Sequence, residues 1–113
     1  MRAGSEVTTG PIPVGQFVNL IRNTIRHDQL FQNQVITGEI TQWKRYPSGH
    51  TYFTLRDSEG QISAVIWQGR CHIDPIIEEG SVVVVIANLD LYAKAGKIQL
   101  VVNRIEPVNK LGL

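Results

Sequence analysis

Cysteine is almost absent from this sequence of 113 residues, in which Cys71 stands alone. A single cysteine excludes an internal disulfide and any metal site built from several cysteines. It fits a reducing compartment, so we expect a cytoplasmic protein. Long apolar runs are missing too, because no stretch approaches the roughly 20 residues needed to span a bilayer. The start of the chain has no charged-then-apolar signal pattern, so we expect neither secretion nor a membrane partner.

An excess of one charge is also missing. The formal net charge is +1, so the charge of the whole chain predicts no partner. The distribution is uneven, however, since residues 57–90 carry six acids and Arg70 is their only Lys or Arg. Positive charge gathers before and after that block, which allows a basic face opposite an acidic face.

Catalytic and metal-binding patterns are missing as well. The sequence has no Gly-Lys-Ser/Thr phosphate-binding motif and no Ser-His-Asp arrangement, and its 3 histidines are isolated. The nearest candidates for a metal-binding carboxylate group are Glu39, Asp57 and Glu59, but they are scattered over a strand start and a tight turn. We therefore expect no metal, no cofactor and no catalysis by this chain alone.

The length suits one domain with one hydrophobic core. Residues 1–12 are small, polar and interrupted by Gly and Pro, which predicts a flexible tail. From 13 to 30, apolar residues recur at spacings of three and four, which predicts an amphipathic helix. Such a helix docks on a core or, alternatively, lies on a membrane surface, although two arginines make a thin basic face. Its apolar stripe consists of Val14, Phe17, Val18, Ile21 and Ile25.

Five strand-like runs follow, separated by turn residues. They are residues 34–43 with a bend or bulge at Gly38, then 51–56, 61–68, 81–92 and 98–106. The first three form a meander, an irregular link with one helical turn at 76–79 follows, and the last two form a hairpin. This order predicts a mostly β fold, a five-stranded OB-fold Greek-key barrel with an N-terminal amphipathic helix. The domain spans 13–107, and we interpret 108–113 as a truncated linker.

Basic residues gather in two loops of the predicted barrel. An OB-fold binds oligomers across its second and third strands and the loops that join strands one to two and four to five. Here those loops are residues 44–50 and 93–97, the most basic segments of the chain. This agreement predicts single-stranded nucleic acid as the partner. The expected phosphate contacts are Lys44, Arg45, Arg56, Lys94 and Lys97.

Aromatic residues near these loops are the expected positions for base stacking. If Phe53 and Leu55 face the core, alternation places Tyr52, Thr54 and Arg56 on the outer face of the second strand. Tyr46 lies at the first loop and can also stack. Three further residues leave alternatives open: Trp43 stacks or plugs the barrel end, His50 contacts the ligand or closes the turn through a backbone hydrogen bond, and Trp67 is a second platform or covers a mixed core under the helix.

Several motifs carry a family resemblance. They are Gly38-Glu39-Ile40-Thr41, Ser48-Gly49-His50, Tyr52-Phe53-Thr54-Leu55-Arg56-Asp57, and Leu91-Tyr92 with Gly96 and Gln99. In this combination the chain resembles the N-terminal domain of the exodeoxyribonuclease VII large subunit, over roughly residues 14–107. The resemblance implies an OB-fold DNA-binding domain attached to a larger C-terminal portion, which carries catalysis and binds many copies of a small subunit. The family degrades single-stranded DNA to short oligonucleotides.

Two functions follow as hypotheses. In the first, the domain captures single-stranded DNA and presents it to a catalytic region outside this chain. In the alternative, it is a protein–protein assembly domain of the same nuclease complex, whose binding face or leading helix docks another subunit or the C-terminal region. Under either hypothesis we expect this chain alone to be non-catalytic.

Overall fold

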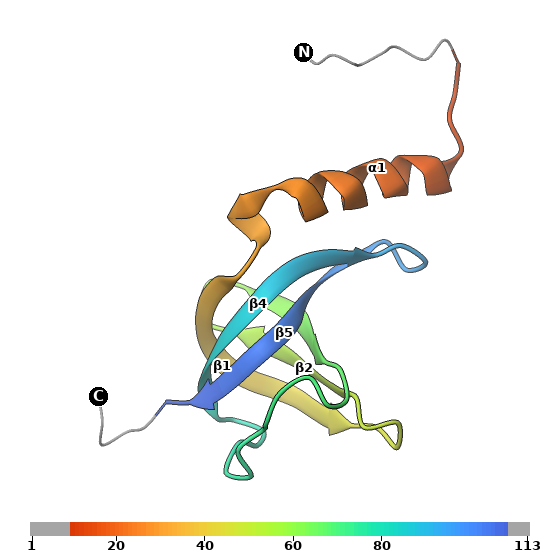
Figure 1. The fold of residues 1–113 in the computed structure, drawn as a ribbon. Helices are drawn as coiled ribbons and strands as arrows, with labels where there is room; N and C mark the ends of the chain where they lie inside the picture. The colour runs from red at the N-terminus through yellow and green to blue at the C-terminus, as the bar shows by residue number, and fades with distance from the viewer. Residues whose placement is uncertain (1–9, 109–113) are drawn as a thin grey trace.

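The structure, a computed structural model, describes residues 10–108. Most of the predicted tail and of the predicted linker therefore lies outside the described residues. One helix and a short 3-10 turn precede five strands, which close into a barrel (Figure 1). The elements are α1 (Val14–His27), η1 (Gln29–Phe31), β1 (Gln34–Arg45), β2 (Thr51–Arg56), β3 (Gln61–Ile66), β4 (Val82–Tyr92) and β5 (Lys97–Pro107).

The strand order around the barrel is β1-β2-β3-β5-β4. Neighbouring strands are antiparallel except for β3 and β5, which pair in parallel through Ala64–Leu100 and Val65–Val101. A meander followed by a hairpin that returns to close the barrel is the arrangement of an OB-fold. The predicted fold class is confirmed.

β1 bends at Gly38 because it belongs to two sides of the barrel. It pairs with β4 from Gln34 to Glu39 and with β2 from Glu39 to Arg45. A Cβ atom on Gly38 would lie 2.9 Å from the Arg56 carbonyl oxygen, so only glycine allows β2 to come this close. Of the two predicted possibilities, Gly38 is the bend, since the bulge lies farther along the strand.

That bulge is formed by Gln42 and Trp43, where the register between β1 and β2 shifts. Gln42 has a φ of 57°, and the backbone N–H groups of Gln42 and Trp43 both donate to the Glu79 carboxylate at 2.9 Å. The N–H groups of Trp43 and Gln42 hold the pKa of Glu79 below its ordinary value. A carboxylate from the link between β3 and β4 thus satisfies two donors that the bulge removes from the strand ladder.

β1 continues past the bulge to Arg45. The prediction that the strand ends at Trp43 is therefore wrong, because the shifted register lets Lys44 pair with Tyr52 and Arg45 with Thr51. Both cations belong to a strand end, which holds them more firmly than a loop would.

The link between β3 and β4 contains two successive turns. The N–H of Ile77 donates to the Asp74 carbonyl at 3.0 Å, and the N–H of Ser81 donates to the Glu78 carbonyl at 2.9 Å. The Asp74 carboxylate also accepts from the N–H of Ile76, which favours a turn over a helix. The predicted helical turn at 76–79 is therefore wrong.

β3 ends at Ile66, two residues earlier than predicted. The N–H of Arg70 donates to the Trp67 carbonyl at 3.0 Å, and Gly69 has a φ of 73°. This turn takes the chain off the barrel wall directly after the strand, so Trp67 lies at the corner rather than within β3.

The core follows the predicted alternation along β2. Phe53 and Leu55 are buried, whereas Tyr52 and Arg56 are exposed. Thr51 is completely buried on the same side as Phe53, and its hydroxyl has no hydrogen-bond partner among the described residues. β4 also alternates, with Val83 and Val85 fully buried, which agrees with a strand that curves round the barrel.

α1 packs against β4 mainly through its C-terminal half. Ile25 is its buried residue, and Arg22 and Arg26 contact the Asp90 carboxylate at 3.4 and 2.9 Å. The N-terminal part of the apolar stripe stays open, with Val14 78% and Phe17 53% exposed. The amphipathic helix is confirmed, but its docking is limited to one end.

The helix also ends earlier than predicted. α1 stops at His27, and the Asp28 carboxylate accepts from the N–H of Leu30 at 2.9 Å, which starts the short turn η1. No helix within residues 10–108 is long and apolar enough to cross a membrane.

Candidate nucleic-acid interface

Four aromatic side chains meet on the outer side of the barrel, where the β1–β2 turn approaches the end of β3. We call them the ring cluster: Tyr46, His50, Tyr52 and Trp67. The ring centroids are 5.2 Å apart for Tyr46–Tyr52, 6.2 Å for Tyr52–Trp67 and 5.0 Å for His50–Trp67. All three contacts are edge-to-face, a favourable geometry for aromatic pairs.

The rings of this cluster remain partly open. Tyr46 is 41%, Tyr52 36% and Trp67 38% exposed. Large apolar rings that stay exposed on a barrel wall are available to stack on a ligand. Val65, the cross-strand partner of Tyr52, is fully buried, so Tyr52 projects from a well-packed part of the wall.

Of the two interpretations of Trp67, the cover under the helix does not fit the structure, and the platform stays a prediction. Its ring contacts the rings of Tyr52 and His50 and is more than one-third exposed. It therefore joins the outer-face aromatics of β2. α1 packs against β4, on another side of the barrel wall from the β2–β3 pair (Figure 1).

His50 closes its own turn through its carbonyl, which accepts from the N–H of Tyr46, and its ring accepts a second backbone hydrogen bond from outside the turn. The N–H of Gln68 donates to His50 Nδ1 at 2.9 Å, which ties the β1–β2 turn to the chain after β3. Because Nδ1 accepts, the neutral ring carries its proton on Nε2. The hydrogen bond from Gln68 also holds the His50 ring edge-to-face against Trp67.

The β1–β2 turn is held close to this corner by Gly49. Its φ is 94°, and an added Cβ atom would lie 2.7 Å from Gln68 Cγ. The N–H of Gly49 donates to the Tyr46 carbonyl at 2.8 Å, and the N–H of Tyr46 donates to the His50 carbonyl at 2.9 Å. Only glycine combines this backbone conformation with this contact.

Trp43 does not belong to the ring cluster. The ring centroids of Trp43 and Phe53 are 5.3 Å apart, and the two ring planes meet at 46°. The half-buried Trp43 side chain packs against the barrel core. Of the two alternatives for Trp43, the structure supports the barrel plug. The bulge at Gln42 accounts for this, because an extra residue turns the following side chain to the opposite face.

Thr54 and Arg56 lie on the outer face of β2 as predicted, yet both have protein partners. The Thr54 hydroxyl donates to Gln42 Oε1 at 3.1 Å. Arg56 forms an ion pair with Glu39 at 3.4 Å, with both side chains well exposed. Exposed pairs of this kind are weak, so Arg56 can exchange Glu39 for a phosphate at little cost.

The predicted cations form two groups. Lys44 and Arg45 lie at the end of β1, and the Lys44 ammonium is 5.0 Å from the centre of the Tyr46 ring. Lys94 and Lys97 lie at the β4–β5 turn. Within residues 10–108, none of these four side chains forms an ion pair.

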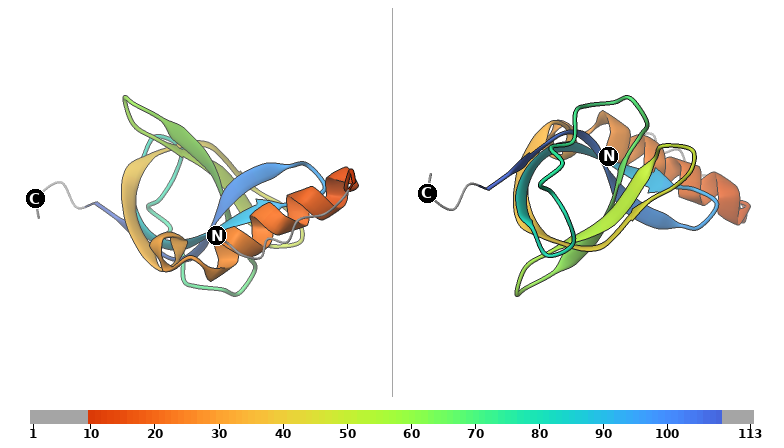
Figure 2. Two further views of the ribbon diagram at one scale, coloured as in Figure 1. Left: turned by 90° about the horizontal axis from the view of Figure 1, so that it is seen from above. Right: turned by 90° about the horizontal axis from the view of Figure 1, so that it is seen from below.

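The two basic turns project to the same side of the barrel. In Figure 1 the β4–β5 turn is at the upper right and the β1–β2 turn at the lower right, and the view from below in Figure 2 again shows both on one side. The structure brings Lys44 to the ring cluster, and Arg45 follows it at the end of β1. Lys94 and Lys97 form a second, separate basic group at the β4–β5 turn.

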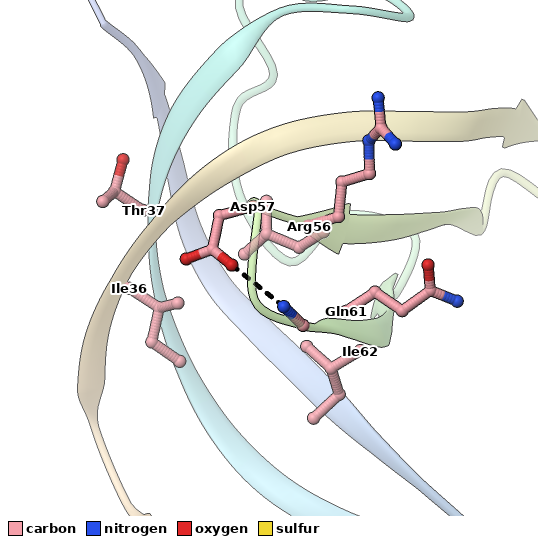
Figure 3. Close-up of a pocket in the computed structure, with 8 residues that line it drawn as sticks. Ile36, Thr37, Arg56, Asp57, Gln61 and Ile62 are labelled. Atoms are coloured by element: carbon pink, nitrogen blue, oxygen red, sulfur yellow. Dashed lines mark hydrogen bonds between the residues drawn. The ribbon is translucent and has the colours of Figure 1, made fainter.

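The barrel has a hollow at the other end of β2 (Figure 3). Its floor includes Ile36 and Ile62, and its rim includes Arg56 and Asp57. The Asp57 carboxylate accepts from the N–H groups of Glu59 and Gly60 at 2.8 and 3.1 Å, so it closes the β2–β3 turn. Nowhere in residues 10–108 do three His, Cys, Asp or Glu side chains come together as metal ligands.

Three supporting residues were not predicted from the sequence: Gln42, Gln68 and Glu79. Each acts through a contact with a residue distant in the chain, with Thr54, His50 and the β1 bulge respectively. Nothing in the local pattern around these residues marks such a contact. No sequence pattern predicts the positive φ of Gln42 either.

A closed five-stranded barrel with exposed rings between basic turns defines an OB-fold nucleic acid binding domain. The chain belongs to this family, which matches its residues 12–106. Its relatives are exodeoxyribonuclease 7 large subunits, which confirms the resemblance in the sequence motifs. It is 32% identical over 98 residues to that of Exiguobacterium sibiricum and 36% identical over 101 residues to that of Lachnoclostridium phytofermentans. These matches cover 86% and 88% of this chain but only 22% and 25% of the two relatives.

A solved structure shares the same fold. A replication protein A heterotrimer bound to single-stranded DNA matches with a TM-score of 0.57, over 69% of this chain and 58% of that chain. The sequence identity is 15%, so this likeness concerns the fold alone.

Proposed function

We propose that this chain is the single-stranded DNA-binding domain of an exodeoxyribonuclease VII-like large subunit, and that it presents DNA to a catalytic region outside this chain. The observation that carries the proposal is the ring cluster with Lys44 beside it, at the basic end of β1. Stacking on an aromatic ring contributes about 1–3 kcal/mol per base and tolerates any sequence. The neighbouring cations attract the phosphates that join those bases.

Single strands suit this surface better than a duplex. Bases reach an aromatic ring only when their faces are free, and in a duplex those faces are stacked on neighbouring base pairs. The replication protein A structure that shares the fold is bound to single-stranded DNA. The nuclease name of the relatives favours DNA over RNA.

The other partners are proposed from the length of the relatives. Since this chain spans about a quarter of them, catalysis and contacts with a small subunit are assigned to the remainder. A lone cysteine supports a cytoplasmic site of action.

Tryptophan fluorescence tests the proposal. Trp67 belongs to the ring cluster and Trp43 to the core, so a Trp43→Phe background leaves Trp67 as the reporter. Addition of oligo-dT at low salt is expected to quench this signal. In the same background, Tyr52→Ala is expected to weaken binding about tenfold or more.

Phe17→Ala is the matched control, because it removes an exposed ring from α1, outside the ring cluster. It is expected to bind oligo-dT as the parent does. Absence of both quenching and gel retardation at low salt would rule out DNA binding. Equal affinity of Tyr52→Ala and the parent would place the binding surface elsewhere.

The exposed stripe of α1 favours a second candidate, an assembly role. Val14 and Phe17 of this stripe and the neighbouring Leu20 are more than half exposed, and most of the length of the relatives lies outside this chain. The occupant we assign is the C-terminal portion of the longer subunit. Co-purification with that portion, weakened by Phe17→Ala, supports this role, whereas self-association in sedimentation would make a second copy the occupant.

A further inference from the structure

Neighbouring rings of the cluster are almost perpendicular to one another. The planes of Tyr46 and Tyr52 meet at 83°, and those of Tyr52 and Trp67 at 88°. In a stacked single strand, successive bases are parallel and about 3.4 Å apart. Two bases that lie flat on neighbouring rings of this cluster therefore cannot stay stacked on each other.

The surroundings hold this perpendicular arrangement in place. Tyr52 lies between Tyr46 and Trp67, on a strand of the closed barrel. Trp67 also meets the ring of His50 at 81°, and His50 is anchored by the N–H of Gln68. On the other side, Lys44 lies over the Tyr46 ring. A DNA strand that made the rings parallel would have to break several of these contacts. The bases, rather than the rings, must therefore turn.

We propose that the ring cluster selects strands whose neighbouring bases are unstacked, and that it therefore prefers oligo-dT to oligo-dA. The inference rests on the proposed DNA binding and adds a specificity to it. Adenines stack on one another more strongly than thymines, so an adenine strand must lose stacking before it can occupy two rings. Preferences of this kind arise from stacking strength and strand flexibility, without hydrogen-bond readout of the bases.

Titration of the full chain with labelled dT12, dU12 and dA12 at one salt concentration tests the inference by fluorescence anisotropy. We expect dT12 to bind roughly three- to tenfold more tightly than dA12, since one disrupted stacking step accounts for up to about tenfold. dU12 is expected to bind like dT12, because the thymine methyl group is not the cause. If dU12 binds as weakly as dA12, the preference is assigned to a contact with the thymine methyl group and the inference is overturned.

A variant without the two rings that contact Tyr52 separates geometry from composition. Tyr46→Ala/Trp67→Ala leaves Tyr52 and His50, which are not in ring contact with each other. The affinity for both oligonucleotides is therefore expected to fall and the dT/dA ratio to approach one. Phe17→Ala is expected to keep the parent ratio. Circular dichroism confirms that the variant is folded.

The outcomes distinguish the inference from the function on which it rests. If no oligonucleotide binds at low salt, the proposed function fails. If dT12 and dA12 bind the parent equally well, DNA binding stands and the stacking inference fails. The stacking inference also fails if the dT/dA ratio of Tyr46→Ala/Trp67→Ala equals that of the parent.

Discussion

Thr51 places a hydroxyl in the barrel core where no described residue accepts or donates a hydrogen bond to it. A buried polar group without a partner costs about 1–3 kcal/mol. Thr51→Val keeps the branched shape and removes the hydroxyl, so we expect the free energy of unfolding to rise by about 1 kcal/mol in urea titrations.

Thr51→Ser provides the opposite change at the same position. It keeps the hydroxyl and loses a buried methyl group, so it is expected to lower the free energy of unfolding by about 1 kcal/mol. A Thr51→Val chain that is less stable than the parent would show that the hydroxyl has a hydrogen-bond partner after all.

The faces of individual residues were predictable only where the strand is regular. Along β2, alternation correctly placed Phe53 in the core and Tyr52 outside. Along β1 it does not hold, since Ile40 and Trp43, three residues apart, both contact the core. The bulge at Gln42 changes the side of every later residue, and its stabilising partner Glu79 comes from a distant segment.

At the scale of the element, the β1–β2 turn depends on Gly49. Gly49→Ala places a side chain at a φ of 94° and against Gln68. We expect it to lower the free energy of unfolding by about 1–2 kcal/mol, and to weaken oligo-dT binding because Tyr46 and His50 lose their positions. Urea unfolding and anisotropy measure the two effects.

Gly49→Ala/Gln68→Ala separates the two causes of that loss. Removal of the Gln68 side chain relieves the contact but not the backbone strain, so partial recovery of stability is expected. Full recovery would show that the positive φ carries no cost for alanine here. A Gly49→Ala chain as stable as the parent would contradict the close packing of this turn.

The attachment of α1 to β4 predicts a dependence on pH. Partial burial raises the pKa of Asp90, but hydrogen bonds from Arg26, the N–H of Leu91 and Arg22 outweigh it, so the pKa lies below its ordinary value. The ion pairs therefore stabilise the protein fully above the pKa of an unfolded Asp, about 4, and this contribution disappears as the pH falls through the lower folded pKa.

Asp90→Asn tests this attachment. At pH 7 it is expected to lower the free energy of unfolding by about 1 kcal/mol or less, because the Arg22 and Arg26 side chains are 32% and 48% exposed and solvent screens the pairs. Below the lowered folded pKa, where Asp90 is protonated, the parent and the variant are expected to be equally stable. A difference that stays the same in acid would contradict the assignment of Asp90 as a charged tether.

The helix was predictable, but the fraction of its apolar face that the barrel buries was not. Periodicity identifies which face of α1 is apolar, because residues three and four apart share a side. It does not show how far a neighbouring element extends along that face. Here β4 meets the end with Ile25 and leaves Val14 and Phe17 open.

At the scale of the whole molecule, the separated basic turns predict the salt dependence of binding. If Lys44, Arg45, Lys94 and Lys97 each neutralise one phosphate, log affinity for a single strand falls with log salt at a slope near −3, from about −0.7 per contact. Titrations with oligo-dT at several salt concentrations measure this slope.

Lys94→Ala/Lys97→Ala tests whether one strand reaches both basic turns. The slope is expected to become less steep by about 1.4, twice the value per contact. Arg104→Ala is the control, since Arg104 lies on β5 and pairs with Glu106. An unchanged slope in the lysine variant would confine the strand to the ring cluster and the end of β1.

The architecture was predictable because turn residues mark every strand boundary to within two residues. Few small closed folds have three consecutive strands followed, after a link, by a hairpin. The corner formed by His50, Trp67 and Gln68 could not be foreseen, because it depends on a contact between two turns 18 positions apart. The binding surface was therefore predicted as a set of residues, and their mutual angles came only from the structure.

β5 pairs with β4 on one side and in parallel with β3 on the other, so it is the strand that closes the wall. A chain that emerges from the ribosome N-terminus first must therefore expose the free edge of β3 until the last strand has been made. Unpaired edges invite association with other chains. Closure through such distant pairs is also slow, on the order of milliseconds to seconds. The interval before β5 arrives is the period in which this domain is most exposed to misassembly during synthesis.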